Sequence, residues 1–152
     1  MVQGTAQFMA RELLDPYQSI QPIVHEKKHD VESFIWVLSY CILRFINDHV
    51  LKSAAKSEVQ VEAPEFENLF NSAFGKSTRH SIATERQSGS PVFSFVYSPT
   101  FSEITKRMSN ALIKLLLTLR QMIHDASSFG ASPIPLTHDA LLAAVNTAIE
   151  SL

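Results

Sequence analysis

Residues 29–46 read HDVESFIWVLSYCILRFI, and this stretch decides the fold class. From residue 34 to residue 46 only Ser39 and Arg44 are polar. We therefore predict a helix over about residues 31–51, with Asp30 as its N-cap. A helix that is apolar on nearly every side must be covered by neighbours, so we expect it to be the buried centre of the fold. Thirteen residues of helix rise only about 20 Å, so we expect no membrane span.

After this stretch, apolar residues at helical spacing predict three more helices. One follows Pro64, one runs from Ser102 to about His124, and the last is capped by Thr137. The apolar stripe predicted for the last helix comprises Leu141, Leu142, Val145, Ala148, Ile149 and Leu152. The predicted fold is therefore mainly α.

Segment 75–99 is rich in Ser and Thr and has no clear period, so we predict an irregular loop. Its apolar residues could pack against the core or pair as a short strand: Val92, Phe93, Phe95, Val96 and Tyr97.

Composition narrows the class of protein. The 152 residues suit one domain, and 45% hydrophobic with 18% charged residues is typical of a globular chain. The net charge of −2 provides no basic field, so we expect neither nucleic acid nor a membrane surface as a partner. The single cysteine, Cys41, forms no intramolecular disulfide, and residues 1–10 do not resemble a secretory signal. We expect an intracellular protein, cytoplasmic or nuclear.

Two short motifs lie at the N-terminal end. The first is Gly4-Thr5-Ala6-Gln7-Phe8-Met9-Ala10-Arg11-Glu12, and the second is His29-Asp30-Val31-Glu32-Ser33-Phe34. The first resembles the end of a kinase activation segment, with Arg11 where that segment usually has Pro. Together with His25 and the Thr-His-Asp start of the last helix, the motifs resemble the fungal-type protein kinase family. The resemblance is specific over residues 4–44 and weak over residues 59–135.

The resemblance implies a single partial domain over residues 1–152, with residues 1–24 as the end of the activation segment. This domain would be the helical C-lobe portion of a kinase fold, without the N-lobe and the catalytic loop. The resemblance also implies roles for three residues. Thr5 would lie beside the substrate hydroxyl, Glu12 would form a buried ion pair that anchors the loop, and Asp30 would bond to the backbone of the catalytic loop.

Each of these residues also has an ordinary interpretation. Asp30 could be only an N-cap, Thr5 a loop residue, and Glu12 a solvated carboxylate in a first helical turn. The arginine that usually pairs with the residue at Glu12 precedes the last helix, but residues 125–136 contain no Arg. Arg79, Arg86 or Arg120 could replace it.

Phosphoryl transfer needs a Lys on the phosphates, Asp and Asn on Mg²⁺, and an Asp at the substrate hydroxyl. The sequence contains no His-Arg-Asp, Asp-Phe-Gly or Gly-x-Gly-x-x-Gly string. We therefore predict no catalytic, cofactor-binding or metal-binding residue, and no activity for this chain alone. ATP and Mg²⁺ belong to the intact family, whose members phosphorylate Ser or Thr. The expected partner is the missing kinase portion or another protein, and a helical interaction module or pseudokinase remnant is the alternative.

A zinc protease is a further alternative, because residues 25–29 match His-Glu-x-x-His. On a helix, His25 and His29 would face one zinc ion, and Glu26 would activate its water. Lys27 and Lys28 oppose this interpretation because they would lie beside a dication. Pro22 and the predicted cap at Asp30 also place the string between helices, where the spacing loses its meaning.

Overall fold

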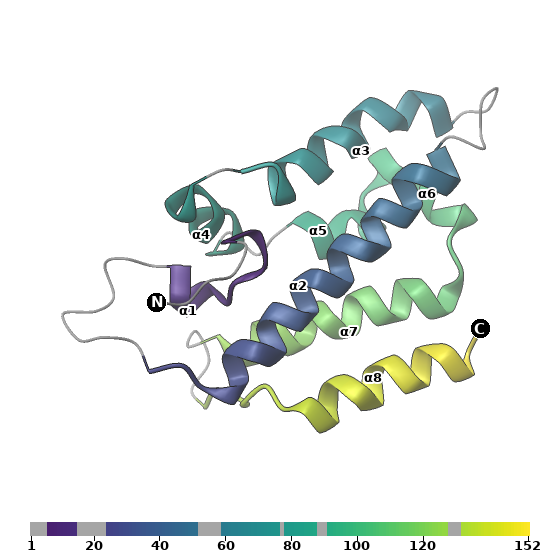
Figure 1. Cartoon of the computed structure of the whole chain (residues 1–152). Helices are drawn as coiled ribbons and strands as arrows, with labels where there is room; N and C mark the ends of the chain where they lie inside the picture. The colour runs from purple at the N-terminus through teal and green to yellow at the C-terminus, as the bar shows by residue number, and fades with distance from the viewer. Residues whose placement is uncertain (1–5, 15–23, 52–58, 77, 88–90, 128–131) are drawn as a thin grey trace.

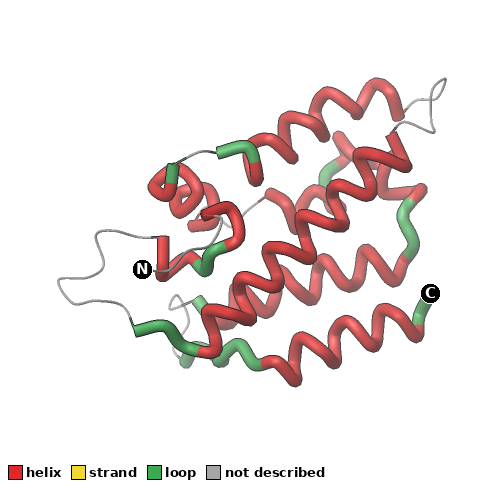
Figure 2. Tube along the Cα trace, viewed as in Figure 1, coloured by secondary structure: helices red, strands yellow, loops and turns green. Residues whose placement is uncertain are grey.

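The computed structural model describes residues 6–14, 24–51, 59–76, 78–87, 91–127 and 132–152. Figure 2 shows helices and loops in these residues and no strand, which confirms the mainly α fold. Several helices pack around one long central helix, α2 (Figure 1). Their bounds are α1 Arg11–Leu14, α2 Lys27–Phe45, α3 Val59–Phe74, α4 Arg79–Gln87, α5 Pro91–Ser94, α6 Ser102–Arg107, α7 Asn110–Ala126 and α8 His138–Glu150.

Helix α2 begins earlier than the sequence predicted. Its first residue is Lys27, and a π-helical turn, Ile46–Leu51, continues it at the other end. The prediction that Asp30 is the N-cap is therefore wrong, because Asp30 lies within the first turn and Glu26 holds the cap position. The backbone N–H of His29 donates to the Glu26 carbonyl at 2.9 Å, and the Glu26 N–H donates to His29 Nδ1 at 3.0 Å. These two bonds fix the helix start upstream of Asp30.

One side of α2 forms the core of the molecule. Ile35, Trp36 and Leu43 are buried there, against Phe66 of α3 and Phe93 of α5. Leu115, Leu116 and Leu119 of α7 close the same cluster. The prediction of a central core helix is therefore confirmed for this side of α2.

No segment of the described ranges covers the opposite side of α2, so the prediction that neighbours cover the helix all round is wrong. Phe34 is 67% exposed and Phe45 is 53% exposed, and Val37 and Cys41 lie exposed between them. By length and composition the helix Lys27–Leu51 could cross a membrane, but the core helix of a soluble protein meets the same criterion.

Segment 75–99 is not the irregular loop that its composition predicted. Helices α4 and α5 occupy much of it, and a 3-10 turn, Phe95–Tyr97, follows α5. Val92, Phe93 and Phe95 are buried in the core, which confirms that this segment packs against it. Tertiary packing stabilises these short helices, which have weak periodicity of their own.

The C-terminal half of the chain differs from the prediction at one point. The helix predicted from Ser102 to about His124 is two helices, α6 and α7, because Met108 is extended and Ser109 caps α7 by accepting from the Leu112 N–H at 3.2 Å. Helix α8 packs along α7, and Thr137 caps it as predicted. In its predicted stripe Leu141 is buried, whereas Leu142 and Ile149 are largely exposed.

Helix α3 is longer than predicted. It begins at Val59, so Pro64 lies inside the helix and not before it. Phe66 and Phe74 are buried on the side that faces α2, as the spacing predicted.

Candidate functional site

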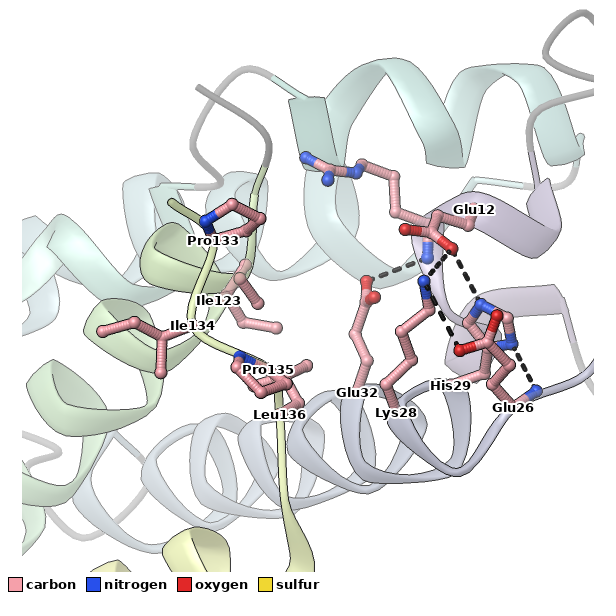
Figure 3. A pocket seen from close by; sticks show the side chains of 12 residues that line it. Glu12, Glu26, Lys28, His29, Glu32, Ile123, Pro133, Ile134, Pro135 and Leu136 are labelled. Atoms are coloured by element: carbon pink, nitrogen blue, oxygen red, sulfur yellow. Dashed lines mark hydrogen bonds and ion pairs between the residues drawn. The ribbon is translucent and has the colours of Figure 1, made fainter. Parts of the chain in front are cut away.

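The N-terminal segment meets the start of α2 at a cluster of charged side chains (Figure 3). Glu12 of α1 accepts from Lys28 Nζ at 2.9 Å and from His29 Nε2 at 2.8 Å. We name Glu12, Lys28 and His29 the Glu12 cluster. It joins two segments that residues 15–23 separate in the sequence.

His29 is the buried member of the Glu12 cluster, and both of its ring nitrogens are bonded. Nδ1 accepts from the Glu26 backbone N–H, so the ring proton lies on Nε2 and is donated to Glu12. A histidine held in this way orients the carboxylate and has no lone pair left for another ligand.

Glu32, one turn further along α2, makes a second connection to the N-terminal segment. Its Oε1 accepts from the Arg11 backbone N–H at 2.8 Å and from Trp36 Nε1 at 3.2 Å. The Glu32 carboxylate thus links the backbone of Arg11, the first residue of α1, to the indole of Trp36 in the core.

Arg86 of α4 makes the third connection. Its guanidinium donates to the carbonyl oxygens of Gln7 and Met9 and lies over the Trp36 ring, 4.2 Å from the ring centroid. Burial lowers the pKa of Arg86 to about 10, and the charge of Glu32 partly opposes this shift. Arg86 stays charged at neutral pH and holds residues 7–9 against α2.

The contacts between Glu12 and Lys28 explain the pKa shifts of these two residues. Burial alone would raise the pKa of Glu12, but the hydrogen bonds from His29 and Lys28, together with the charge of Lys28, outweigh it. The net pKa of Glu12 therefore lies below its ordinary value. The hydrogen bond to Glu12 raises the pKa of Lys28 above its ordinary value. Both residues are therefore charged across the neutral range.

The Glu12 cluster lines one wall of a cavity of about 340 Å³. The other wall is the segment that leads into α8, with Pro133, Ile134, Pro135 and Leu136, and Ile123 of α7 lies beside it (Figure 3). The segment before the last helix thus lies across the cavity from Glu12. By the family resemblance, the arginine partner of Glu12 would come from this segment.

The structure corrects the prediction for Glu12 in two respects. Its partners are Lys28 and His29, and none of Arg79, Arg86 and Arg120 fills that place in the described contacts. Its side chain is 36% exposed, so the ion pair is half-buried and not buried. Sequence reasoning missed Lys28, His29 and Glu32 at this site, because their contacts with the N-terminal segment join residues far apart in the chain.

The structure describes one of the other two predicted residues. Thr5 falls outside the described residues. Asp30 is 57% exposed and lies 3.3 Å from His25 Nε2, so it is not joined to the Glu12 cluster.

The zinc arrangement predicted as an alternative does not form at residues 25–29. His29 uses both ring nitrogens within the protein, and His25 lies before the helix and pairs with Asp30. Within the described ranges, no three His, Cys, Asp or Glu side chains gather closely enough to hold a metal ion.

A comparison with known protein families gives a match at the N-terminal end of the chain. The family model described as "Fungal protein kinase" matches residues 1–42, which include the Glu12 cluster, Glu32 and Trp36. No curated protein and no solved structure matches the chain. The similarity therefore covers the N-terminal segment and most of α2.

Proposed function

We propose that this chain is the C-lobe portion of a fungal-type Ser/Thr protein kinase and that it transfers no phosphate by itself. The Glu12 cluster carries the proposal. By resemblance, Glu12 anchors the end of the activation segment to the lobe, and in the structure Glu12 joins the N-terminal segment to α2. The family match covers both sides of this contact.

Two further contacts support the same role for the N-terminal segment. Glu32 and Arg86 bind its backbone at Arg11, Gln7 and Met9, so the segment is held by its main chain and not only by side chains. A loop that presents a substrate must keep its conformation. The contacts with the Glu12 cluster and Glu32 at α2, and with Arg86 of α4, make the N-terminal segment rigid.

The chemistry of the site explains why we expect no activity from the chain alone. Phosphoryl transfer needs cations and Mg²⁺ around the phosphates. Lys28 is already paired with Glu12, and Arg86 with backbone carbonyls. The described residues provide anchors, and the catalytic groups would come from another portion of the kinase.

The test uses the transcript and two proteins. We expect the reading frame upstream of Met1 to encode His-Arg-Asp and Asp-Phe-Gly strings. The extended protein should phosphorylate Ser or Thr peptides with Mg²⁺ and ATP, while the homogeneous 152-residue chain should not. An extended protein with Glu12→Ala should lose activity, whereas Glu65→Ala, on the exposed surface of α3, should keep it.

Two results would contradict the proposal. Phosphorylation by the homogeneous 152-residue chain would show that it contains a catalytic apparatus. An upstream frame without a catalytic loop would remove the parent kinase and favour the alternative, a helical interaction module. The exposed apolar side of α2 gives that alternative a physical basis.

A further inference from the structure

A stripe of apolar side chains runs along the uncovered side of α2. Its members recur at helical spacing and lie exposed: Phe34, Val37, Cys41 and Phe45. We name these four residues the α2 stripe. A single exposed apolar residue is common on protein surfaces, whereas a continuous row along a helix indicates a surface that binds another molecule.

A second apolar row lies on α8 and adjoins the first. Leu142 and Ile149 are largely exposed, and Leu152 is 85% exposed. Leu152 lines a cavity of about 460 Å³ together with Cys41 and Phe45, so the two rows meet there. Figure 1 shows α7 running between α2 and α8, and Leu112 of α7 lines the same cavity. We name the α2 stripe with the α8 row the α2–α8 face.

The size of this face suits a protein interface. Its large apolar side chains together expose on the order of 600 Å², close to the roughly 800 Å² that each partner contributes to a standard interface. Such an area exceeds what a small ligand would cover.

The charges at the two ends of the α2 stripe indicate which protein fits it. Lys27 and Asp30 lie at its N-terminal end, and Arg44 and Asp48 lie at its C-terminal end. An antiparallel helix of the same sequence, centred on Val37, would place Asp30 opposite Arg44 and would bring Lys27 to within one residue of the level of Asp48. The charges that flank the α2 stripe are therefore complementary to those of a second, antiparallel copy.

We propose that two copies of this chain associate through the α2–α8 face, with their α2 helices antiparallel about a two-fold axis near Val37. The member of the α2 stripe nearest to Phe34 across the axis is then Cys41 of the second copy, one residue beyond the level of Phe34. The Asp30 and Arg44 side chains exchange their present partners, His25 and Asp48, for each other across the axis. Because every contact occurs twice in a two-fold dimer, weak individual contacts are doubled.

This dimer does not rest on the proposed kinase function. It uses only exposed residues of α2 and α8, whereas the Glu12 cluster and Arg86 lie on the part of the molecule that holds the N-terminal segment. A failed dimer test would leave the kinase proposal standing, and a failed kinase test would leave the dimer standing.

The first test is the oligomeric state of the full chain, measured by sedimentation over a wide range of concentration. We expect a monomer–dimer equilibrium. Val37→Asp should raise the dimer Kd by at least about tenfold, because the interface would bury an unpaired carboxylate. The matched control is Val61→Asp on exposed α3, which should leave the Kd unchanged. Circular dichroism checks that both variants fold.

The second test is charge reversal. Asp30→Arg and Arg44→Asp should each weaken the dimer, and the double variant should recover it, because the opposite charges are then exchanged across the axis. Cys41 lies four residues from the axis in each copy, so the two thiols are about 12 Å apart along the helices and mild oxidation should not join them within this dimer. A monomer at every concentration, a dimer indifferent to Val37→Asp, a double variant no better than the singles, or a larger assembly would each overturn the proposal.

Discussion

Arg86 shows how a single buried cation organises the N-terminal segment. It combines two backbone acceptors, Gln7 and Met9, with the face of Trp36. Burying a guanidinium lowers its pKa, here to about 10, because the charged form loses its hydration. The hydrogen bonds and the aromatic ring replace that hydration only while residues 7–9 stay in place.

Removing this cation should loosen the segment. Arg86→Ala leaves the carbonyls of Gln7 and Met9 without their donor, and we expect a loss of about 2–3 kcal/mol in the free energy of unfolding. Arg79→Ala, at the exposed start of the same helix, is the control and should cost less than about 0.5 kcal/mol. Urea denaturation measures both, and equal losses would show that the Arg86 contacts contribute no stability.

Glu12 gives the site a pH dependence with a defined sign. Its pKa in the folded protein lies below the ordinary value of 4.5, so the unfolded chain binds the proton more tightly. The stabilisation is therefore complete above about pH 4.5 and is lost as the pH falls through the folded pKa.

Unfolding midpoints measured across this range should reveal the effect. Wild-type protein should lose stability on acidification below pH 4.5 more steeply than Glu12→Gln, and the two should converge at the acidic end. Glu67→Gln, an exposed carboxylate on α3, should follow the wild-type curve. Parallel curves for wild type and Glu12→Gln would mean that the cluster does not favour the ionised carboxylate.

At the scale of elements, α6 depends on a residue from another helix. Glu62 of α3 is buried, and its carboxylate accepts from the backbone N–H groups of Glu103 and Ile104, both at 3.0 Å. These N–H groups belong to the first turn of α6 and have no partner within that helix. A six-residue helix is too short to be stable by propensity alone, so this cap fixes its place.

Glu62→Ala should therefore uncap α6 and cost about 1–2 kcal/mol, the usual range for a lost N-cap. The control is Glu65→Ala on the exposed side of α3, which should change the unfolding free energy by less than about 0.5 kcal/mol. Amide hydrogen exchange adds a local measurement, since Glu103 and Ile104 should lose protection first. Unchanged protection at these two amides would exclude the capping role.

At the scale of the whole molecule, α2 contributes buried side chains to the core from one side and has exposed apolar side chains on the other. Trp36 is 2% exposed and packs against Phe93 with ring centroids 5.4 Å apart. Phe34, two residues earlier, lies on the opposite side. The same helix therefore offers a buried and an exposed aromatic residue for comparison.

We expect Trp36→Ala to cost about 3–5 kcal/mol, through lost burial and the cavity left behind. A domain of this size has only about 5–15 kcal/mol in total, so this variant should be close to unfolding or aggregate. Phe34→Ala should change the unfolding free energy little at concentrations where the chain is monomeric. Similar midpoints for the two variants in chemical denaturation would mean that α2 is not the core helix.

The sequence by itself determined the existence of the main helices and their apolar sides. Local periodicity fixed α2 and α8, and the Thr137 cap followed from a hydroxyl at the helix start. The family resemblance, and not the local pattern, implied an ion pair at Glu12; the pair in the structure is half-buried and its partners are Lys28 and His29. These features depend on neighbours within a turn or on a short motif, so the order of residues is enough to predict them.

Only the tertiary structure decided the rest, because those features depend on residues far apart in the chain. Helix α4 forms in a polar segment because Ile82 and Arg86 pack against residues 7–14. Glu12 binds Lys28 and His29 in the first turn of α2, although residues 15–23 lie between these segments in the sequence. One side of α2 is uncovered although its sequence is apolar all round. Whether an apolar side chain is buried depends on which other segments reach it, and a single helix's pattern does not contain that information.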